Sequence, residues 1–103
     1  MLQSTELILQ IIRSIPKGKV TSYSRIGSLA GYPNGGRLVS RLLSSCSRKY
    51  SLPWHRVVSA SGKISLPPET GGELQAELLR KEGVVVQNYK VDLRIYGWEP
   101  DSN

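Results

Sequence analysis

Hydrophobic residues recur at helical spacing near the start of the chain and predict a helix over residues 5–15. Isoleucines occupy positions i, i+3, i+4 and i+7 of this segment: Ile8, Ile11, Ile12 and Ile15. Ser4 or Thr5 is a suitable N-cap, and Pro16 with Gly18 ends the pattern. The segment is therefore predicted to be an amphipathic helix that packs one face on a core.

Two further amphipathic segments follow, separated by a glycine-rich turn. The first covers residues 22–30, begins at a Thr-Ser pair with capping side chains, and closes at Gly31. The turn over residues 32–36 contains one proline and two glycines. The second helix starts at about Gly36. Its predicted inward residues are Leu38, Leu42 and Leu43, and its predicted outward residues are Arg37, Ser40, Arg41 and Ser44.

The next part of the chain predicts irregular structure. Residues 53–58 and 62–64 are expected to be short extended pieces bent at glycine. Residues 65–72 contain two prolines and two glycines, which is typical of a loop. No internal repeat or linker divides the chain at this point.

The last third predicts one more helix and a terminal hairpin. Thr70 is the expected helix cap and Gly83 the expected stop. The helix is predicted to bury Leu74, Leu78 and Leu79 and to expose Glu73, Glu77, Arg80 and Lys81. Residues 84–86 and 91–93 are expected to pair as a hairpin. Together the elements indicate a mainly α fold with small β pieces, forming a single domain over residues 1–103.

Composition narrows the class of protein. The single cysteine excludes a disulfide framework within the chain and fits a reducing compartment. Glu6 stands where a secretory leader has basic residues, and no apolar run approaches the roughly 18 residues that span a bilayer. One histidine and one cysteine imply no metal site. We therefore expect an intracellular protein without membrane contact. In a bacterium, we expect it in the cytoplasm, associated with the nucleoid.

Positive charge is concentrated in the middle of the chain. The 14 lysines and arginines outnumber the 8 acidic residues and give a net charge of +6. No acidic residue occurs between Lys17 and Lys63. The basic residues of this stretch are Lys17, Lys19, Arg25, Arg37, Arg41, Arg48, Lys49, Arg56 and Lys63. Such an excess is typical of a protein that binds a polyanion, and it favours nucleic acid over a generally soluble surface.

The second and third predicted helices have the outline of a helix-turn-helix. Two short helices meet at a tight glycine-rich turn, and the second presents arginines and serines outward. A plain packing hairpin has the same outline. The absence of acidic residues from this region favours DNA binding.

One short loop carries the most concentrated chemistry of the chain. Trp54, His55 and Arg56 place an indole, an imidazole and a guanidinium in succession directly after Pro53. Proline restricts the backbone that leads into the loop. Stacking, proton transfer and phosphate pairing are available together, which predicts a site. A core tryptophan is the alternative interpretation, and the polar residues directly after Trp54 disfavour it.

This loop resembles the Pro-Cys-His-Arg-Val motif of the O6-alkylguanine-DNA alkyltransferases, with Trp54 at the position of the nucleophilic cysteine. The resemblance runs from residues 15–20 to residues 82–83. The matching pieces, in the family's order, are residues 20–23, 30–31, 37–39, 53–58 and 61–62. The chain is most similar to the alkyltransferase-like members, which bind alkylated guanine in DNA without removing the alkyl group. The resemblance implies a winged helix-turn-helix-like DNA-binding domain of the alkyltransferase C-terminal type.

The resemblance also implies roles for individual residues. The implied lesion pocket consists of Tyr23, Trp54, His55 and Val57, and the implied DNA contacts come from Tyr23, Ser24, Arg37, Ser40 and Arg41. Arg37 matches the finger that fills the stack after a nucleotide rotates out, and Tyr23 matches the residue that helps drive the rotation. The family's activation relay corresponds to His55, Glu82 and Arg56, which we expect to be structural here, with a phosphate contact by Arg56 as the minority interpretation.

The chemistry of Trp54 argues against alkyl transfer. Displacement on an alkyl carbon needs a soft nucleophile such as a thiolate, and an indole N–H is only a donor. An indole can instead stack on an extruded base, a contact worth about 1–3 kcal/mol. Two alternatives stay open: an alkyltransferase that uses another nucleophile, such as Cys46, and a helix-turn-helix regulator that reads undamaged sequence.

The loop after the motif departs from the family pattern. Active alkyltransferases carry a Tyr-Ser-Gly-Gly run there, and residues 66–72 keep only the glycines. We therefore expect a wider pocket that tolerates bulkier adducts. The expected partners are double-stranded DNA that contains O6-alkylguanine and nucleotide excision repair proteins. We expect a monomer with no catalytic residue and no cofactor.

Overall fold

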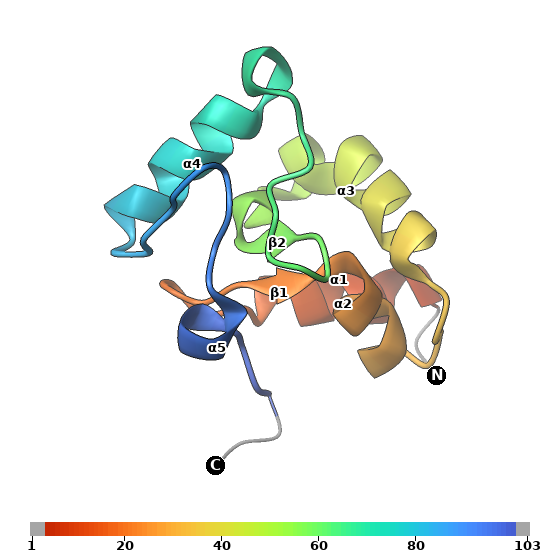
Figure 1. Ribbon diagram of the computed structural model, residues 1–103. Helices are drawn as coiled ribbons and strands as arrows, with labels where there is room; N and C mark the ends of the chain where they lie inside the picture. The colour runs from red at the N-terminus through yellow and green to blue at the C-terminus, as the bar shows by residue number, and fades with distance from the viewer. Residues whose placement is uncertain (1–3, 101–103) are drawn as a thin grey trace.

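The computed structural model describes residues 4–100, with the side chains of all of them except residues 4 and 47–50. The elements in chain order are α1 (Ser4–Arg13), β1 (Thr21–Ser22), α2 (Tyr23–Leu29), α3 (Gly36–Tyr50), η1 (Trp54–Arg56), β2 (Val57–Val58), η2 (Pro68–Thr70), α4 (Gly72–Lys81) and α5 (Leu93–Tyr96). Figure 1 shows the strand pair in the middle, with α1, α2 and α3 to one side and α4 and α5 to the other. This mainly helical fold confirms the predicted class. Within residues 4–100, no helix has the length and apolarity needed to cross a membrane.

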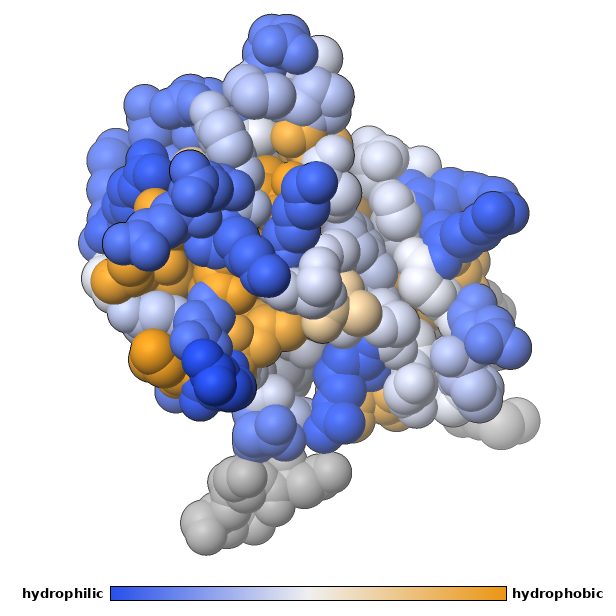
Figure 2. Space-filling model, viewed as in Figure 1, coloured by the Kyte–Doolittle hydropathy of each residue, from blue (hydrophilic) through white to orange (hydrophobic). Residues whose placement is uncertain are grey.

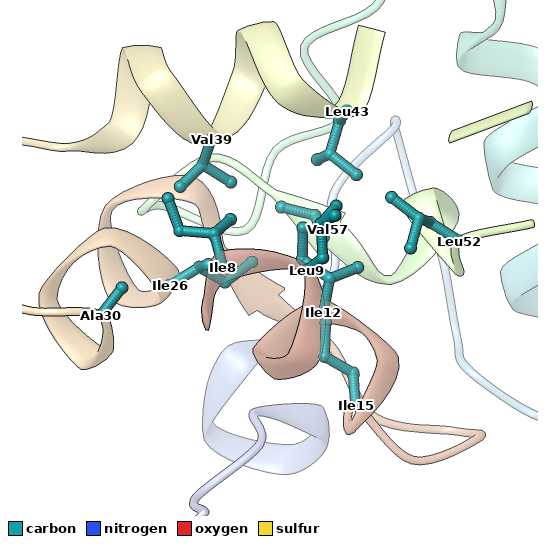
Figure 3. Close-up of a cluster of buried hydrophobic side chains, with 10 residues drawn as sticks. All are labelled: Ile8, Leu9, Ile12, Ile15, Ile26, Ala30, Val39, Leu43, Leu52 and Val57. Atoms are coloured by element: carbon teal, nitrogen blue, oxygen red, sulfur yellow. The ribbon is translucent and has the colours of Figure 1, made fainter. Parts of the chain in front are cut away.

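Two hydrophobic clusters meet at β2. The first cluster, shown in Figure 3, consists of Ile8, Leu9, Ile12, Ile15, Ile26, Ala30, Val39, Leu43, Leu52 and Val57. The second cluster consists of Val20, Val58, Ile64, Ala76, Leu79, Val84, Val86 and Val91. Successive side chains of a strand point to opposite faces, so the two neighbouring valines of β2 enter different clusters.

A parallel strand pair joins the start of α2 to the Trp54 loop. Thr21 pairs with Val57 and Ser22 with Val58. The C-terminal segment extends this arrangement, because the backbone N–H of Trp98 donates to the Val20 carbonyl at 2.8 Å. Such a short pairing between distant segments has no local pattern in the sequence, and it was not predicted.

The predicted helix-turn-helix is built around a close approach of α2 and the start of α3. Ser22 caps α2 as expected, because its hydroxyl accepts a hydrogen bond from the Arg25 N–H at 3.1 Å. A Cβ atom on Gly27 would lie 3.0 Å from the Gly35 Cα atom. Glycine at both positions therefore allows a turn that larger residues would open.

The predicted faces of the first helices are correct in outline and shifted in detail. α1 ends at Arg13, two residues before the predicted boundary. Ile11, which was predicted to face the core, is only half-buried, and Leu9 is buried instead. In α3 the buried residues are Val39 and Leu43, whereas Leu38 and Leu42 are half-buried. The outward face is confirmed: Arg37, Ser40, Arg41 and Ser44 are all exposed.

Three predictions for the motif loop and for α4 are wrong. Residues 54–56 form the single 3₁₀ turn η1 and are not extended. In α4 Leu74 is 50% exposed, and the fully covered side chains are Gln75, Ala76 and Leu79. The helix is rotated relative to the prediction because Gln75 finds buried hydrogen-bond acceptors. Thr70 is not its cap, since Gly71 precedes the helix and supplies no side-chain bond.

The predicted terminal hairpin is also wrong. In the described chain, this region has isolated bridges that pair Lys90 with Gln87 and with Lys63, not two strands. Leu93 begins α5, because the Asp92 side chain caps that helix by accepting the Arg94 N–H at 2.9 Å. An N-cap aspartate therefore ends the extended backbone earlier than the valine pattern suggests.

Candidate nucleic-acid interface

A groove of about 790 Å³ opens between α3, η1 and the start of α4. Its lining residues are Tyr23, Ser40, Leu43, Ser44, Ser51, Leu52, Trp54, His55, Leu66, Thr70 and Leu74. The groove brings together three of the four predicted pocket residues, Tyr23, Trp54 and His55, from separate segments of the chain. Ser40, predicted as a DNA contact, lies on the same wall.

Trp54 lies at the boundary between the groove and the core. Its side chain is half-buried, packs against the first cluster and lines the groove. The Trp54 and His55 rings meet edge to face, with centroids 6.2 Å apart and planes at 86°. The backbone N–H of Trp54 donates to the Leu52 carbonyl at 2.8 Å, which fixes the start of η1. The indole is therefore held by the core and still available to a planar ligand.

One carboxylate joins three segments behind the groove. Glu82 accepts hydrogen bonds from His55 Nε2 at 2.7 Å, from Arg56 Nη2 at 2.8 Å and from the Gly18 N–H at 2.9 Å. Arg56 Nη1 also donates to the Ile15 carbonyl at 2.8 Å. The three residues expected from the family relay are thus in contact, and they connect the end of α4, the motif loop and residues 15–18.

The Glu82 site strongly favours the ionised carboxylate. Burial raises the pKa of Glu82, but the hydrogen bonds from Arg56, His55 and the Gly18 N–H outweigh burial and lower the pKa to about 2. Because the carboxylate is ionised, His55 Nε2 must carry the proton of their hydrogen bond. His55 therefore uses this nitrogen as a donor to Glu82.

Val57 does not line the groove, so its predicted place in the pocket is wrong. Its side chain has no exposed surface and belongs to the first cluster. The cause is the alternation of β2, which turns Val57 into the core, and its carbonyl is also occupied by Gln75.

Gln75 is the main residue that sequence reasoning missed. It is 1% exposed, and its Nε2 donates to the His55 carbonyl at 3.1 Å and to the Val57 carbonyl at 2.9 Å. These two bonds fix the backbone of the motif loop against α4. No local signal marks a glutamine for burial, and the predicted inward face of this helix, with Leu74, Leu78 and Leu79, includes neither Gln75 nor Ala76.

The loop over residues 65–72 supplies a wall of the groove that was not predicted. Leu66, Thr70 and Leu74 line it, with Leu66 37% and Leu74 50% exposed. A Cβ atom on Gly72 would lie 2.3 Å from the Leu66 carbonyl oxygen. Glycine is required there because the loop turns back directly onto the first residue of α4.

The predicted DNA-contacting residues gather where α2 and α3 begin. Ser24, Arg37, Ser40 and Arg41 are exposed, and Tyr23 is half-buried at the groove. A Cβ atom on Gly36 would lie 3.6 Å from the Ser24 backbone nitrogen, so the two helix starts are adjacent. Figure 2 shows hydrophilic side chains projecting over α3. The side chains of Arg48 and Lys49 lie outside the described part of the chain.

A second cavity of about 620 Å³ lies on the other side of the molecule, near α5. Its lining includes Val85, Val91 and Ile95 as well as Lys90 and Arg94. Figure 2 shows the hydrophobic surface between α4 and α5. No predicted site residue lines this cavity. In residues 4–100 no three His, Cys, Asp or Glu side chains are grouped as metal ligands.

The fold and the groove define a helix-turn-helix DNA-binding domain that carries an aromatic-walled pocket beside its second helix. The chain belongs to the family described as 6-O-methylguanine DNA methyltransferase, DNA binding domain, whose model matches residues 3–84.

Individual relatives agree with this assignment. A DNA base-flipping protein of Vibrio parahaemolyticus is 42% identical over 96 residues, which cover 90% of this chain and 93% of that protein. Alkyltransferase-like protein 1 of Schizosaccharomyces pombe is 32% identical over 99 residues, covering 90% and 92% of the two chains. The crystal structure of S. pombe Atl1 with damaged DNA containing O6-carboxymethylguanine matches with a TM-score of 0.86 at 30% identity, covering 97% of this chain and 100% of that one.

Proposed function

We propose that this chain binds O6-alkylguanine in double-stranded DNA by rotating the damaged nucleotide into the groove beside Trp54, without transferring the alkyl group. The observation that carries the proposal is the half-buried indole of Trp54 on the wall of a groove of about 790 Å³, next to the exposed arginines of α3. The names of the relatives support it, since one is called a base-flipping protein and another was crystallised with damaged DNA.

Binding begins with the start of α3 in the minor groove, where readout is nearly independent of sequence. Arg37 is exposed in the first turn of α3, and its guanidinium takes the space that the rotated nucleotide leaves. Tyr23, at the edge of the protein groove, crowds the phosphate beside the damaged nucleotide. Ser24, Ser40 and Arg41 hold the backbone on either side.

The extruded base is then held by Trp54. Flipping costs a few kcal/mol, less at a damaged pair, and stacking on an aromatic side chain returns roughly 1–3 kcal/mol. The balance is therefore favourable only where the damage has already weakened pairing. Selectivity for lesions follows without any chemical step.

No alkyl transfer follows, because the groove offers no soft nucleophile among the described residues that line it. Trp54 occupies the cysteine position of the resemblance. Cys46 is half-buried on α3, packs against the first cluster and does not line the groove. The residues of the family relay act structurally, since His55 and Arg56 are both bonded to Glu82.

We further propose that the chain acts as a monomer and flags the lesion for nucleotide excision repair. The monomer rests on the contrast with helix-turn-helix regulators, which usually bind as dimers. The repair route rests on the family resemblance. Adding the chain to a reconstituted nucleotide excision repair reaction should increase incision beside O6-alkylguanine, and an unchanged incision rate would remove this part of the proposal.

A binding titration on matched duplexes tests the main proposal. The duplexes differ only in one O6-methylguanine, and both are measured at two stated salt concentrations. We expect roughly ten- to hundredfold tighter binding to the lesion, because the few kcal/mol that flipping costs are reduced at the damaged pair. Equal affinity for both duplexes contradicts lesion recognition. Strong preference among undamaged sequences, with dimers, supports the regulator instead.

A further inference from the structure

We propose that the second cavity, beside α5, is a docking site for another protein, and that it takes an extended segment in which apolar residues alternate with acidic residues. This site goes beyond the proposed lesion binding. It shares no lining residue with the groove at Trp54, and α5 lies on the other side of the strand pair from α3. A docked protein and a DNA duplex on α3 would therefore use different residues.

The first observation is the exposed apolar surface of this cavity. Val85 and Ile95 are 55% and 61% exposed, the highest values among the large hydrophobic residues in the described part of the chain. Both line the cavity, and Figure 2 shows the hydrophobic surface between α4 and α5. The volume of about 620 Å³ lies within the range of roughly 300–1,000 Å³ that is typical of ligand sites. An apolar side chain that enters the cavity removes this surface from water.

The second observation is a hairpin that stops after one residue pair. Gln87 and Lys90 each donate a backbone N–H to the carbonyl of the other, at 3.1 and 3.0 Å. In an antiparallel pair this exchange recurs at every second residue, so Val85 opposite Asp92 would come next. The chain leaves the hairpin there, because Asp92 caps α5. Among the described residues, neither backbone group of Val85 has a hydrogen-bond partner.

A strand of another protein can take the place that the second half of the hairpin leaves. Val85 and Gln87 line the cavity, whereas Val84 and Val86 are buried in the second cluster, which is the alternation of a strand. Arg80 Nη2 donates to the Val86 carbonyl at 3.0 Å and holds this strand in place. An extended segment beside Val85 would pair with its backbone groups, as in β-strand addition. Because the receiving strand is already ordered, little further ordering opposes binding.

The third observation is the charge around the cavity. Its charged lining residues are Lys90, Asp92 and Arg94. Arg94 Nη2 contacts Asp92 at 3.1 Å, so these two charges compensate each other and the charge of Lys90 remains. Lys63, also exposed, is bridged to Lys90 through the backbone and adds a second cation. Carboxylates are the complementary groups for this rim. A DNA backbone would match the cations but leave Val85 and Ile95 uncovered, which favours a protein.

Synthetic peptides test the site on the full chain. The probe is Ser-Glu-Val-Asp-Ile-Glu-Val-Ser, blocked at both ends, whose apolar side chains share one face when it is extended. A second peptide has lysine in place of each acidic residue. Binding is followed through the backbone amide signals of the isotope-labelled chain. We expect the acidic peptide to shift the signals of Val85, Gln87 and Ile95, and to bind roughly tenfold more tightly than the lysine peptide or better.

Two further peptides test strand pairing. Each is the acidic peptide with N-methyl groups on alternate residues, and the two carry opposite sets. Only one edge of the peptide strand faces the domain, so we expect one of the two to lose binding and the other to keep it. Unchanged binding of both overturns the pairing with Val85.

Ile95→Asp tests the position of the site. Leu74→Asp is the matched control, because Leu74 is also an exposed apolar residue, 50% exposed, but lines the groove beside Trp54. Both substitutions exchange an exposed apolar side chain for a carboxylate, and circular dichroism checks that both variants are folded. We expect Ile95→Asp to weaken binding of the acidic peptide roughly tenfold, and the control to change it less than about twofold. Equal losses overturn the assignment to this cavity.

The remaining outcomes are equally decisive. If no signal of the cavity residues shifts at about 1 mM acidic peptide, the proposal fails. Equal affinity for the lysine peptide removes the charge complementarity. A saturating duplex with O6-methylguanine should leave peptide binding unchanged, and loss of peptide binding would instead make this surface part of the DNA interface. Failure of lesion recognition alone leaves the docking site standing, since the two sites share no lining residue.

Discussion

Replacing Glu82 by glutamine should remove a large share of the stability of this domain. The side chain is 10% exposed, and the substitution leaves His55 and the Arg56 guanidinium, 14% and 18% exposed, without their carboxylate. The pKa of Glu82 lies near 2 instead of its ordinary 4.5, a difference of about 2.5 units. At about 1.4 kcal/mol per unit, the carboxylate stabilises the folded state by roughly 3–4 kcal/mol.

The pH dependence of this stabilisation has a definite sign. The pKa of Glu82 is lower in the folded chain than in the unfolded chain, so folding favours the ionised form. The stabilisation is complete above about pH 4.5 and is lost as the pH falls towards 2. The free energies of unfolding of the wild type and of Glu82→Gln should therefore differ most at neutral pH and converge at about pH 2.

Urea unfolding followed by circular dichroism, at a series of pH values, measures this convergence. Glu77→Gln is the matched control, because Glu77 is an exposed carboxylate on α4, the helix that Glu82 directly follows. We expect the control to change the free energy of unfolding by less than about 0.5 kcal/mol at every pH. A difference between Glu82→Gln and the wild type that is absent, or that stays constant from neutral pH to acid, refutes the reasoning.

Three further predictions concern DNA binding. Trp54→Ala should reduce the preference for an O6-methylguanine duplex by roughly 1–3 kcal/mol while keeping most of the salt-dependent affinity for plain DNA, as measured by anisotropy titration. A loss of the folded circular dichroism spectrum would instead make Trp54 a core residue. Arg37→Ala and Tyr23→Phe should weaken lesion binding much more than Lys90→Ala, which changes a residue beside the second cavity. Equal losses in the three variants would reduce Arg37 to a general phosphate contact. After incubation with O6-methylguanine DNA, mass spectrometry should find Cys46 unmodified, and a gain of one methyl group would establish transfer.

The sequence was sufficient where a property depends on local pattern. Helical spacing predicted the buried isoleucines of α1, and cap chemistry predicted that Ser22 starts α2. The exposed face of α3 was predicted correctly because its four polar side chains recur at helical spacing. The neighbourhood of Trp54, His55 and Tyr23 followed from the resemblance, and the groove contains all three.

The remaining features depend on contacts between distant segments. Gln75 is buried because two free carbonyls of the motif loop lie within reach, and no property of its neighbours announces them. Leu74 turns outward as a consequence, although its residue type predicts burial. The close approach of Gly72 to the Leu66 carbonyl likewise depends on how the loop folds back. The part of the groove wall formed by Leu66 and Leu74 therefore could not be predicted from the sequence.

We expect the two valines of β2 to couple the unfolding of the two hydrophobic clusters. Val57 enters the first cluster and Val58 the second, so neither cluster can open without moving the same dipeptide. Slowly exchanging amide protons should therefore be found in both clusters and disappear together at one denaturant concentration. The strand pair also joins residues 21–22 to residues 57–58 and so closes a long loop of the chain, which costs conformational entropy. The recognition groove therefore forms only when segments far apart in the sequence have met, and it is incomplete in any chain that ends before Leu74.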